Sequence, residues 1–145
     1  MQQKNVTIMK QKILAAVAMI CAVTANAEDK TALKIWVESD NFQAYNISAM
    51  PVMKHVDGEL KMCVNGNVLG TYAIQDKMKI TFGEEAQKGD VNCDQSVTMA
   101  DANAIVNQFL SNDVKNINVT AADANEDGTI TMADANNVVN IFLNQ

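Results

Sequence analysis

The chain has 145 residues, which suits one domain or two small ones, and it carries 17 acidic residues against 11 basic ones, all of them Lys. The net charge of −6 and the pI near 4.6 argue against a nucleic-acid partner and against anionic membrane surfaces, since both favour a basic face. One His leaves few groups for general acid–base chemistry, although carboxylates remain available for it.

The N-terminus has the pattern of a signal peptide. Lys10 and Lys12 precede an apolar run at 13–23, and Ala25-Asn26-Ala27 has the A-x-A form of a cleavage site. We expect the functional start at Met9, because the residues before it add nothing that a signal peptide needs. We therefore expect residues 1–27 to be removed and the protein to be secreted.

Two other interpretations of this segment are less favoured. The apolar run is shorter than the roughly 20 residues of a membrane-spanning helix, and Ile20 stands where a lipoprotein has a small residue before Cys21. After cleavage, residues 28–145 hold 8 Lys against 17 acidic residues, a net charge of −9. Such a chain would attract divalent cations, and no membrane insertion is expected.

Residues 28–83 are predicted to form a small β-rich domain. Apolar side chains alternate with polar ones in TALKIWV (31–37) and in ELKMCV (59–64), which is the period of a half-buried strand. Three pairs typical of tight turns separate the runs: Asp40-Asn41, Asp57-Gly58 and Asn65-Gly66. We expect five or six short strands in a meander, with a thin core.

Side chains in this segment raise the question of chemistry. Trp36, Tyr45 and Tyr72 are candidates for stacking on a sugar ring, but they suit a core or a sheet edge better. His55 and Cys63 are the only plausible base and nucleophile, and neither lies in a known catalytic motif, so no enzyme is predicted. Secretion permits a disulfide between Cys63 and Cys93, but two unpaired thiols are favoured.

The composition changes after a polar linker at 84–88. Asp and Asn become frequent, and apolar residues take the i, i+3, i+4, i+7 spacing of a helix in 98–110 and again in 131–143. Residues 111–122 between them are predicted to form a loop or a single helical turn.

The helical segments belong to an internal duplication. Residues 90–110 and 123–143 share 13 of 21 aligned positions at a period of 33. Ankyrin repeats have the same period, but two copies with one helix each and no T-P-L-H phrase exclude that fold.

Each repeat begins with a twelve-residue loop in which oxygen-bearing residues occupy positions 1, 3, 5 and 12. A hard cation such as Ca²⁺ takes six to eight oxygens, and such a loop can supply them from these side chains and from the carbonyl of position 7. Position 9 (Thr98, Thr131) often acts through water. The predicted ligands are Asp90, Asn92, Asp94, Ser96 and Asp101 in the first loop and Asp123, Asn125, Asp127, Thr129 and Asp134 in the second. Mg²⁺ fits less well, because it prefers octahedral geometry with retained waters.

The alternative is a pair of Asx-rich turns that cap helices, and two copies with the same spacing make it the weaker interpretation. The apolar eighth positions, Val97 and Ile130, suggest that the loops pair through a short strand. Both loops have Asp rather than Glu at position 12. Gln95 stands at position 6, where the second loop has Gly128, so we expect weaker binding by the first loop.

DVNCDQSVTMADANAIVNQFL and DANEDGTITMADANNVVNIFL resemble the paired repeats of a type I dockerin domain, over residues 89–145. The resemblance implies a small all-α unit with two bound Ca²⁺ ions that docks onto a cohesin module, and hence an α+β chain. It places partner recognition at Met99, Ala100, Asn103, Asn107, Met132, Ala133, Asn136 and Asn140. Many dockerins have hydroxyl residues at loop positions 10 and 11, where this chain has Met-Ala pairs. An equally weighted role for both Met residues is packing against the other repeat.

The Ala- and Asn-rich style of the chain also resembles secreted proteins of Bacteroidetes, and residues 31–82 resemble a small β-rich module found in them. Three hypotheses follow. The chain is an interaction protein tethered by a cohesin-like receptor to a cellulosome-like or cell-surface assembly that degrades polysaccharides. Alternatively, the calcium repeats stabilise the chain by docking on its own β segment, or the β segment binds carbohydrate and the dockerin tethers it.

Overall fold

The computed structural model describes residues 31–145 apart from 39, 75–77 and 112–115. The predicted signal peptide and the Ala27 cleavage site lie outside these residues. The elements in chain order are β1 (Thr31–Glu38), β2 (Asn41–Asn46), the 3-10 turn η2 (Ile47–Ala49), β3 (Val52–Val56), β4 (Glu59–Val64), β5 (Asn67–Ala73), β6 (Lys79–Glu84), α2 (Met99–Ser111), β7 (Ile117–Asn118), α3 (Val119–Ala122) and α4 (Met132–Leu143).

The strands form two sheets rather than the expected single meander. One sheet has the order β6-β1-β2-β7 and the other has the order β3-β4-β5. Tyr45 of β2 and Tyr72 of β5 join the sheets, because their buried hydroxyl groups hydrogen bond to each other and Tyr72 also donates to Gln43 Oε1 at 2.5 Å. Closing this tyrosine bridge lets two thin sheets share one core.

Local sequence explains the strand ends. Asp57 and Asn65 take left-handed φ angles of 52° and 50°, and each is followed by a glycine with positive φ, as two-residue hairpin turns require. These turns confirm the predicted β3–β4 and β4–β5 hairpins. Leu33 and Ile35 of β1 are fully buried, as their alternation predicts.

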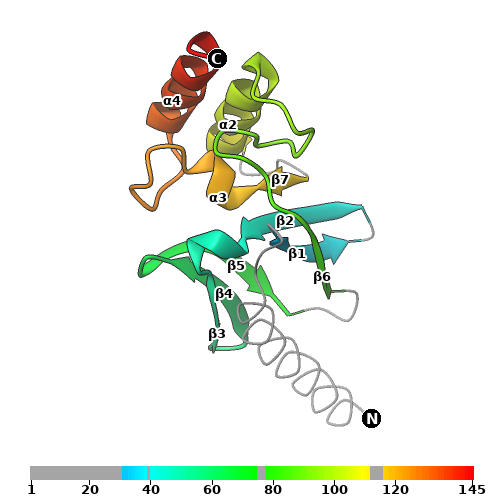
Figure 1. Ribbon diagram of the computed structural model, residues 1–145. Coiled ribbons are helices and arrows are strands. Elements are labelled where there is room, and N and C mark those ends of the chain that lie inside the picture. The colour runs from blue at the N-terminus through cyan, green and yellow to red at the C-terminus, as the bar shows by residue number, and fades with distance from the viewer. Residues whose placement is uncertain (1–30, 39, 75–77, 112–115) are drawn as a thin grey trace, which may run out of the picture.

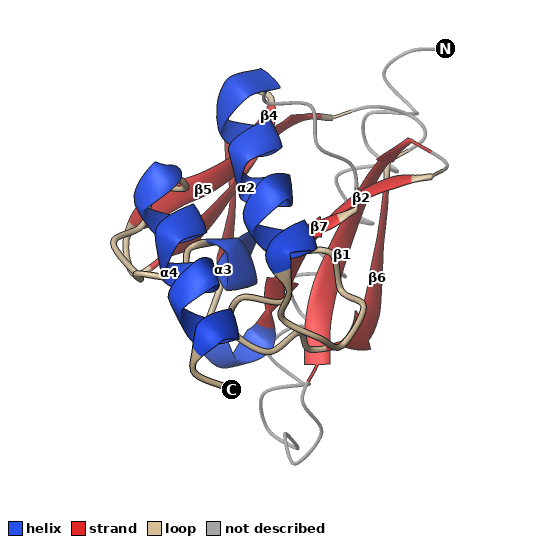
Figure 2. Cartoon of the chain, turned by 90° about the horizontal axis from the view of Figure 1, so that it is seen from above, coloured by secondary structure: helices blue, strands red, loops and turns tan. Residues whose placement is uncertain are grey.

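The two predicted repeat helices are confirmed as α2 and α4, which contact each other along their lengths. Figure 1 shows them at one end of the molecule, with α3 between them and the sheets, and Figure 2 shows them side by side. The prediction of an all-α C-terminal unit is wrong in one detail. Residues 117–118 form a strand that pairs in parallel with β2, matching Gln43 with Ile117 and Ala44 with Asn118.

The C-terminal unit therefore packs on the β-rich part through α3 and β7, and α3 contacts both β2 and β5. Ile117, Val119 and Ala122 are buried in the same core as Leu33 and Tyr45. No helix among the described ranges is long and apolar enough to cross a membrane.

Gly70 on β5 is expected to be intolerant of a side chain. A Cβ atom there would lie 2.0 Å from Tyr45 Oη and 2.7 Å from Tyr72 Oη, so Gly70→Ala should break the tyrosine bridge and lower the free energy of unfolding by about 1–3 kcal/mol. Gly83→Ala is the control, because its Cβ would meet only the flexible Lys34 side chain at 2.9 Å. Urea denaturation measures both, and equal losses for the two variants would contradict the prediction.

Candidate metal centre

The first loop folds its backbone around the side chain of Asp90, its first residue. Asp90 is 1% exposed, its Oδ1 accepts the Asp94 N–H at 3.1 Å, and its Oδ2 accepts the Gln95 N–H at 3.0 Å. Asn92 Oδ1 accepts the Asp94 N–H at 2.9 Å, and Asp94 Oδ1 accepts the Ser96 N–H at 2.9 Å. These Asx bonds turn the chain so that residues at positions 1, 3 and 5 lie on one tight curve.

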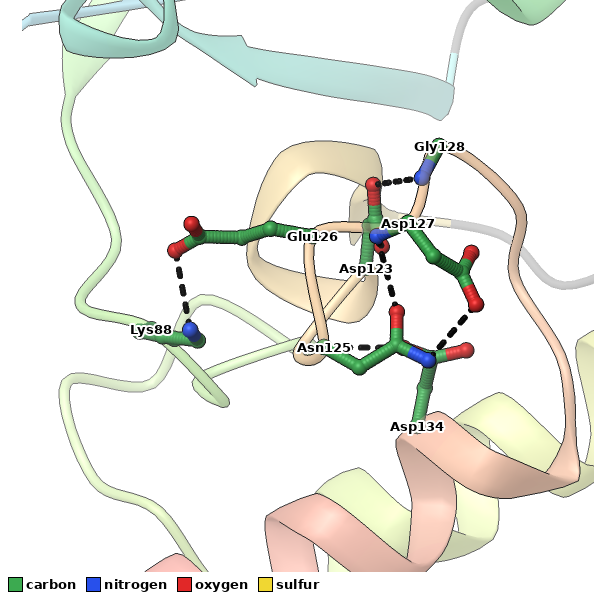
Figure 3. Close-up of polar contacts among 7 residues, drawn as sticks. All are labelled: Lys88, Asp123, Asn125, Glu126, Asp127, Gly128 and Asp134. Carbon is green, nitrogen blue, oxygen red and sulfur yellow. Dashed lines mark hydrogen bonds and ion pairs between the residues drawn. The ribbon is translucent and has the colours of Figure 1, made fainter.

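The second loop repeats these bonds with nearly the same lengths (Figure 3). Asp123 Oδ1 accepts the Asp127 N–H at 3.1 Å, and its Oδ2 accepts the Gly128 N–H at 3.0 Å. Asn125 Oδ1 accepts the Asp127 N–H at 2.9 Å, and Asp127 Oδ1 accepts the Thr129 N–H at 2.9 Å. The duplication seen in the sequence is thus also a duplication of conformation.

The twelfth residue of each loop, Asp101 or Asp134, is fully buried and closes the loop. Asp101 Oδ1 accepts the Val91 N–H at 2.8 Å and its Oδ2 accepts the Thr98 N–H at 2.8 Å. Asp134 makes the same bond to Thr131 and completes a capping box at the start of α4. The loops therefore do cap helices, as the alternative interpretation of Asx-rich turns expects. In each loop the carboxylate at position 12 also accepts a hydrogen bond from the beginning of the loop.

The loops differ at position 6, as the sequence suggests. Gln95 and Gly128 both have left-handed backbones, with φ of 73° and 85°. A side chain at position 6 of the second loop is also excluded by space, because a Cβ on Gly128 would lie 1.9 Å from Asn67 Nδ2. Gln95 instead extends outward, and its Nε2 donates to Glu84 Oε2 at 3.0 Å.

Position 8 does not form the predicted strand. Neither Val97 nor Ile130 is in a β-bridge. Val97 is buried beside Gly89, whose added Cβ would lie 3.2 Å from Val97 Cγ1, and its carbonyl accepts the Gln145 side-chain amide at 3.4 Å. The apolar eighth residue thus fills the core beneath the loop instead of joining it to its partner.

An ion pair that the sequence did not reveal links the two loops instead. Lys88 Nζ, just before the first loop, lies 2.8 Å from Glu126 Oε1 at position 4 of the second loop (Figure 3). Position 4 was not singled out from the sequence, although Cys93 and Glu126 both have a φ of 62° there. The ion pair is exposed and contributes little stability.

The electrostatics of the loops favour a cation. Burial raises the pKa of Asp90 and that of Asp123, although backbone N–H bonds oppose the shift. Hydrogen bonds from the residues at positions 7 and 3 lower the pKa of Asp94 and that of Asp127. The buried carboxylates therefore carry their charge at a cost, and a bound divalent ion would offset it.

The donor set fits Ca²⁺ in kind, because it consists of carboxylate, amide, hydroxyl and backbone oxygens. Among the described residues, no three acidic, His or Cys side chains converge closely enough to hold a metal by themselves. The carboxylates instead accept bonds from loop N–H groups. An ion in either loop would therefore need amide and carbonyl oxygens beside the carboxylates, which is the mixed shell that Ca²⁺ accepts and softer metals do not favour.

Cys93 lies within the first loop and takes no part in this chemistry. It and Cys63 are both unpaired thiols, as predicted, and burial raises the pKa of Cys93 to about 11. The thiol is therefore protonated at neutral pH and is a poor ligand or nucleophile.

All the predicted partner-binding residues are exposed, and they lie on the first turns and outer sides of α2 and α4. Met99 is 47% exposed and Met132 is 42% exposed, so neither packs fully against the other repeat. The β-rich part contacts α3 and leaves these residues uncovered.

Two loop–helix units of this kind, related by duplication, define the class of paired EF-hand-like calcium-binding modules. Residues 88–143 match the family of the dockerin type I domain. Dockerins of this type typically bind calcium, and they are non-catalytic domains that dock onto cohesin modules. No curated protein and no solved structure matches the chain.

Calcium removal is expected to destabilise the protein, because the buried carboxylates lose their counter-charge. One ion at a free concentration 100 times its Kd contributes about 2.7 kcal/mol. Thermal melting of residues 28–145 in Ca²⁺ and in chelator, followed by helical ellipticity, measures the loss. Equal melting temperatures in both would contradict calcium binding by the loops, and Mg²⁺ at the same concentration is the control.

Gln95→Gly should tighten calcium binding by the first loop. A left-handed backbone costs a non-glycine residue about 1 kcal/mol, so relieving it corresponds to roughly a fivefold gain in affinity. Gly128→Gln is the reciprocal variant and should weaken the second loop. Calorimetric titration resolves both changes, and an unchanged affinity in Gln95→Gly would show that the strain at position 6 does not limit binding.

Proposed function

We propose that the chain is a secreted, non-catalytic, calcium-binding docking protein. Its dockerin binds a cohesin-like receptor and tethers the chain to a cellulosome-like or cell-surface assembly that degrades polysaccharides. The observation that carries this proposal is that the two repeat helices keep an uncovered outer face while the dockerin packs on the β-rich part through a different surface.

The uncovered face has the composition of an interface. On α2 it runs from Met99 through Asn103 and Asn107, residues four apart that share one side of a helix, and α4 repeats the pattern. The only charged residues of the two helices are Asp101 and Asp134, which are buried. Loss of charge and enrichment in Met are typical of the centre of a protein–protein interface.

We propose that each loop holds one Ca²⁺, so that two ions bind. The ligands would be the side-chain oxygens at positions 1, 3, 5 and 12 and the carbonyl oxygen of position 7. Calcium fixes the start of α2 and of α4, because position 12 belongs to both the loop and the helix, and this orients Met99 and Met132 toward a receptor.

An enzymatic role is not proposed. His55 on β3 is exposed and Cys63 on β4 is buried. Cys63 pairs with Val52 across the strands, and His55 is an odd number of residues from Val52, so the two side chains point to opposite faces of the sheet. This geometry disfavours the one base–nucleophile pair that the sequence offered.

The second candidate function is structural. The pairing of β7 with β2 supports this candidate, because it brings the C-terminal unit into contact with the β-rich part of the same chain. This contact leaves the Met-bearing face free, so it is compatible with receptor binding. The carbohydrate-binding alternative loses support, because Tyr45 is fully buried and Tyr72 is 5% exposed, and neither can stack on a sugar.

Receptor binding is expected to depend on both helices. The double variant Met99→Asp, Met132→Asp should lower affinity for an immobilised type I cohesin module at least 30-fold, since each change buries a charge in an apolar contact at a cost of about 1–3 kcal/mol. Surface plasmon resonance in Ca²⁺ and in chelator measures it. Met50→Asp is the matched control, because Met50 is 73% exposed and lies beyond β2. Binding that survives the double change would contradict the assigned face.

A further inference from the structure

The last residue of β2, Asn46, makes four hydrogen bonds to segments that follow the β-rich part in the chain. Its Nδ2 donates to the Ala86 carbonyl at 2.7 Å, and its Oδ1 accepts the Ala86 N–H at 3.3 Å and Asn118 Nδ2 at 2.6 Å. Its backbone N–H donates to Thr120 Oγ1 at 2.8 Å. Asn46 thus binds the segment before the dockerin and the middle of the dockerin at once.

Asn118 is the dockerin side of this contact, and it is fully buried. Its Oδ1 accepts the Ala121 N–H at 2.9 Å and the Thr120 hydroxyl at 2.7 Å, so its side chain caps the N-terminus of α3. The amide of Asn118 therefore has partners on both sides, one in the sheet and one in the helix. A buried amide that lost Asn46 would keep an unsatisfied N–H group.

Both calcium loops begin at this junction. The Asn118 N–H donates to the Val91 carbonyl at 2.8 Å, one residue after Asp90, the first ligand of the first loop. The helix that Asn118 caps, α3, ends at Ala122, and its C-cap residue is Asp123, the first ligand of the second loop. The first residue of each loop is therefore fixed, within a few residues, to the same buried residue: the first loop through the backbone N–H of Asn118 and the second through its side-chain amide.

We propose that Asn46, a residue of the β-rich part, is a positioning residue for both calcium sites, and that the Asn46–Asn118 pair couples calcium binding to the folding of the sheet. Asn46 is not one of the predicted calcium ligands. It fixes Asn118, which sets the position of the first loop through Val91 and of the second through α3. Coupling between two sites is reciprocal, so calcium stabilises the β1–β2 sheet to the same extent that the sheet strengthens calcium binding.

The proposal rests on calcium binding by the dockerin and is independent of the receptor. A failure to bind any cohesin would leave it intact, because every test below uses Ca²⁺ alone with the chain 28–145. Conversely, a chain whose sheet ignores calcium could still dock onto a receptor.

Trp36 reports the first half of the coupling. It lies on β1, and its Nε1 donates to Thr81 Oγ1 at 2.7 Å, so its fluorescence follows the sheet while the ellipticity at 222 nm follows the helices. In chelator and in Ca²⁺, the two signals should melt together, and both should move to higher temperature with calcium. A Trp36 transition that calcium does not move, beside a helical transition that it does, would overturn the proposal.

Asn46→Ala tests the second half. Its calcium affinity should fall about fivefold or more, the lower end of typical coupling between sites, and both ions should be affected. Asn41→Ala at the other end of the same strand is the matched control and should bind calcium as the parent chain does. An Asn46→Ala variant that melts cooperatively and keeps the parent affinities would overturn the assignment.

Thr120→Val is a second variant that tests the same junction if Asn46→Ala does not fold. It removes the hydroxyl that bridges the Asn46 N–H and Asn118 Oδ1, while leaving the Asn46–Asn118 amide contact in place. A smaller weakening at both calcium sites is expected. Parent-like calcium binding in Thr120→Val together with independent melting of Trp36 and the helices would exclude coupling through this junction.

Discussion

The C-terminal half of the structure depends on two buried carboxylates, those of Asp101 and Asp134. Each accepts backbone N–H groups from the start of its loop and from the residues just before its helix, so one side chain sets both the closure of the loop and the first turn of the helix. A buried negative charge is stable only when it is well solvated by donors or by a cation. The N–H donors are present in the fold, and a cation in the loop would further stabilise the buried negative charge. The position of the two helices, and of the face that they expose, thus depends on the hydrogen bonds and the cation that stabilise these two carboxylates.

Local patterns were sufficient to predict much of this architecture. The Asp57-Gly58 and Asn65-Gly66 pairs located two hairpins because the backbone conformation they favour is determined by those residues alone. The two helices and the loop positions were equally visible, since one repeat confirmed the spacing of the other. What could not be predicted was contact between distant segments. The arrangement of the two sheets depends on the contact between Tyr45 and Tyr72 across the core. The sequence around either tyrosine does not predict this contact.

The same limit applied within the candidate site. The difference between Gln95 and Gly128 at position 6 is visible in the repeat, but the Lys88–Glu126 ion pair joins positions that no motif singles out. Asn118 stood before a short apolar run, where an Asn often caps a helix, and this was the one available sign of α3. Its bond to Asn46 crosses 72 residues of sequence and could be found only in three dimensions. A sequence repeat thus predicts the symmetric parts of a site, whereas the contacts that break the symmetry need a structure.

The parallel pairing of β2 with β7 has a consequence for the order of folding. β2 leaves the ribosome long before β7, because the residues that pair are 74 apart in the chain. Until Ile117 and Asn118 arrive, one edge of β2 presents unpaired N–H and C=O groups, and such an edge can pair with a strand from another molecule. Contacts of this separation also form slowly, because a long loop must close first. A shortened chain that stops before residue 117 would keep this edge of β2 unpaired, and we expect such a chain to self-associate more readily.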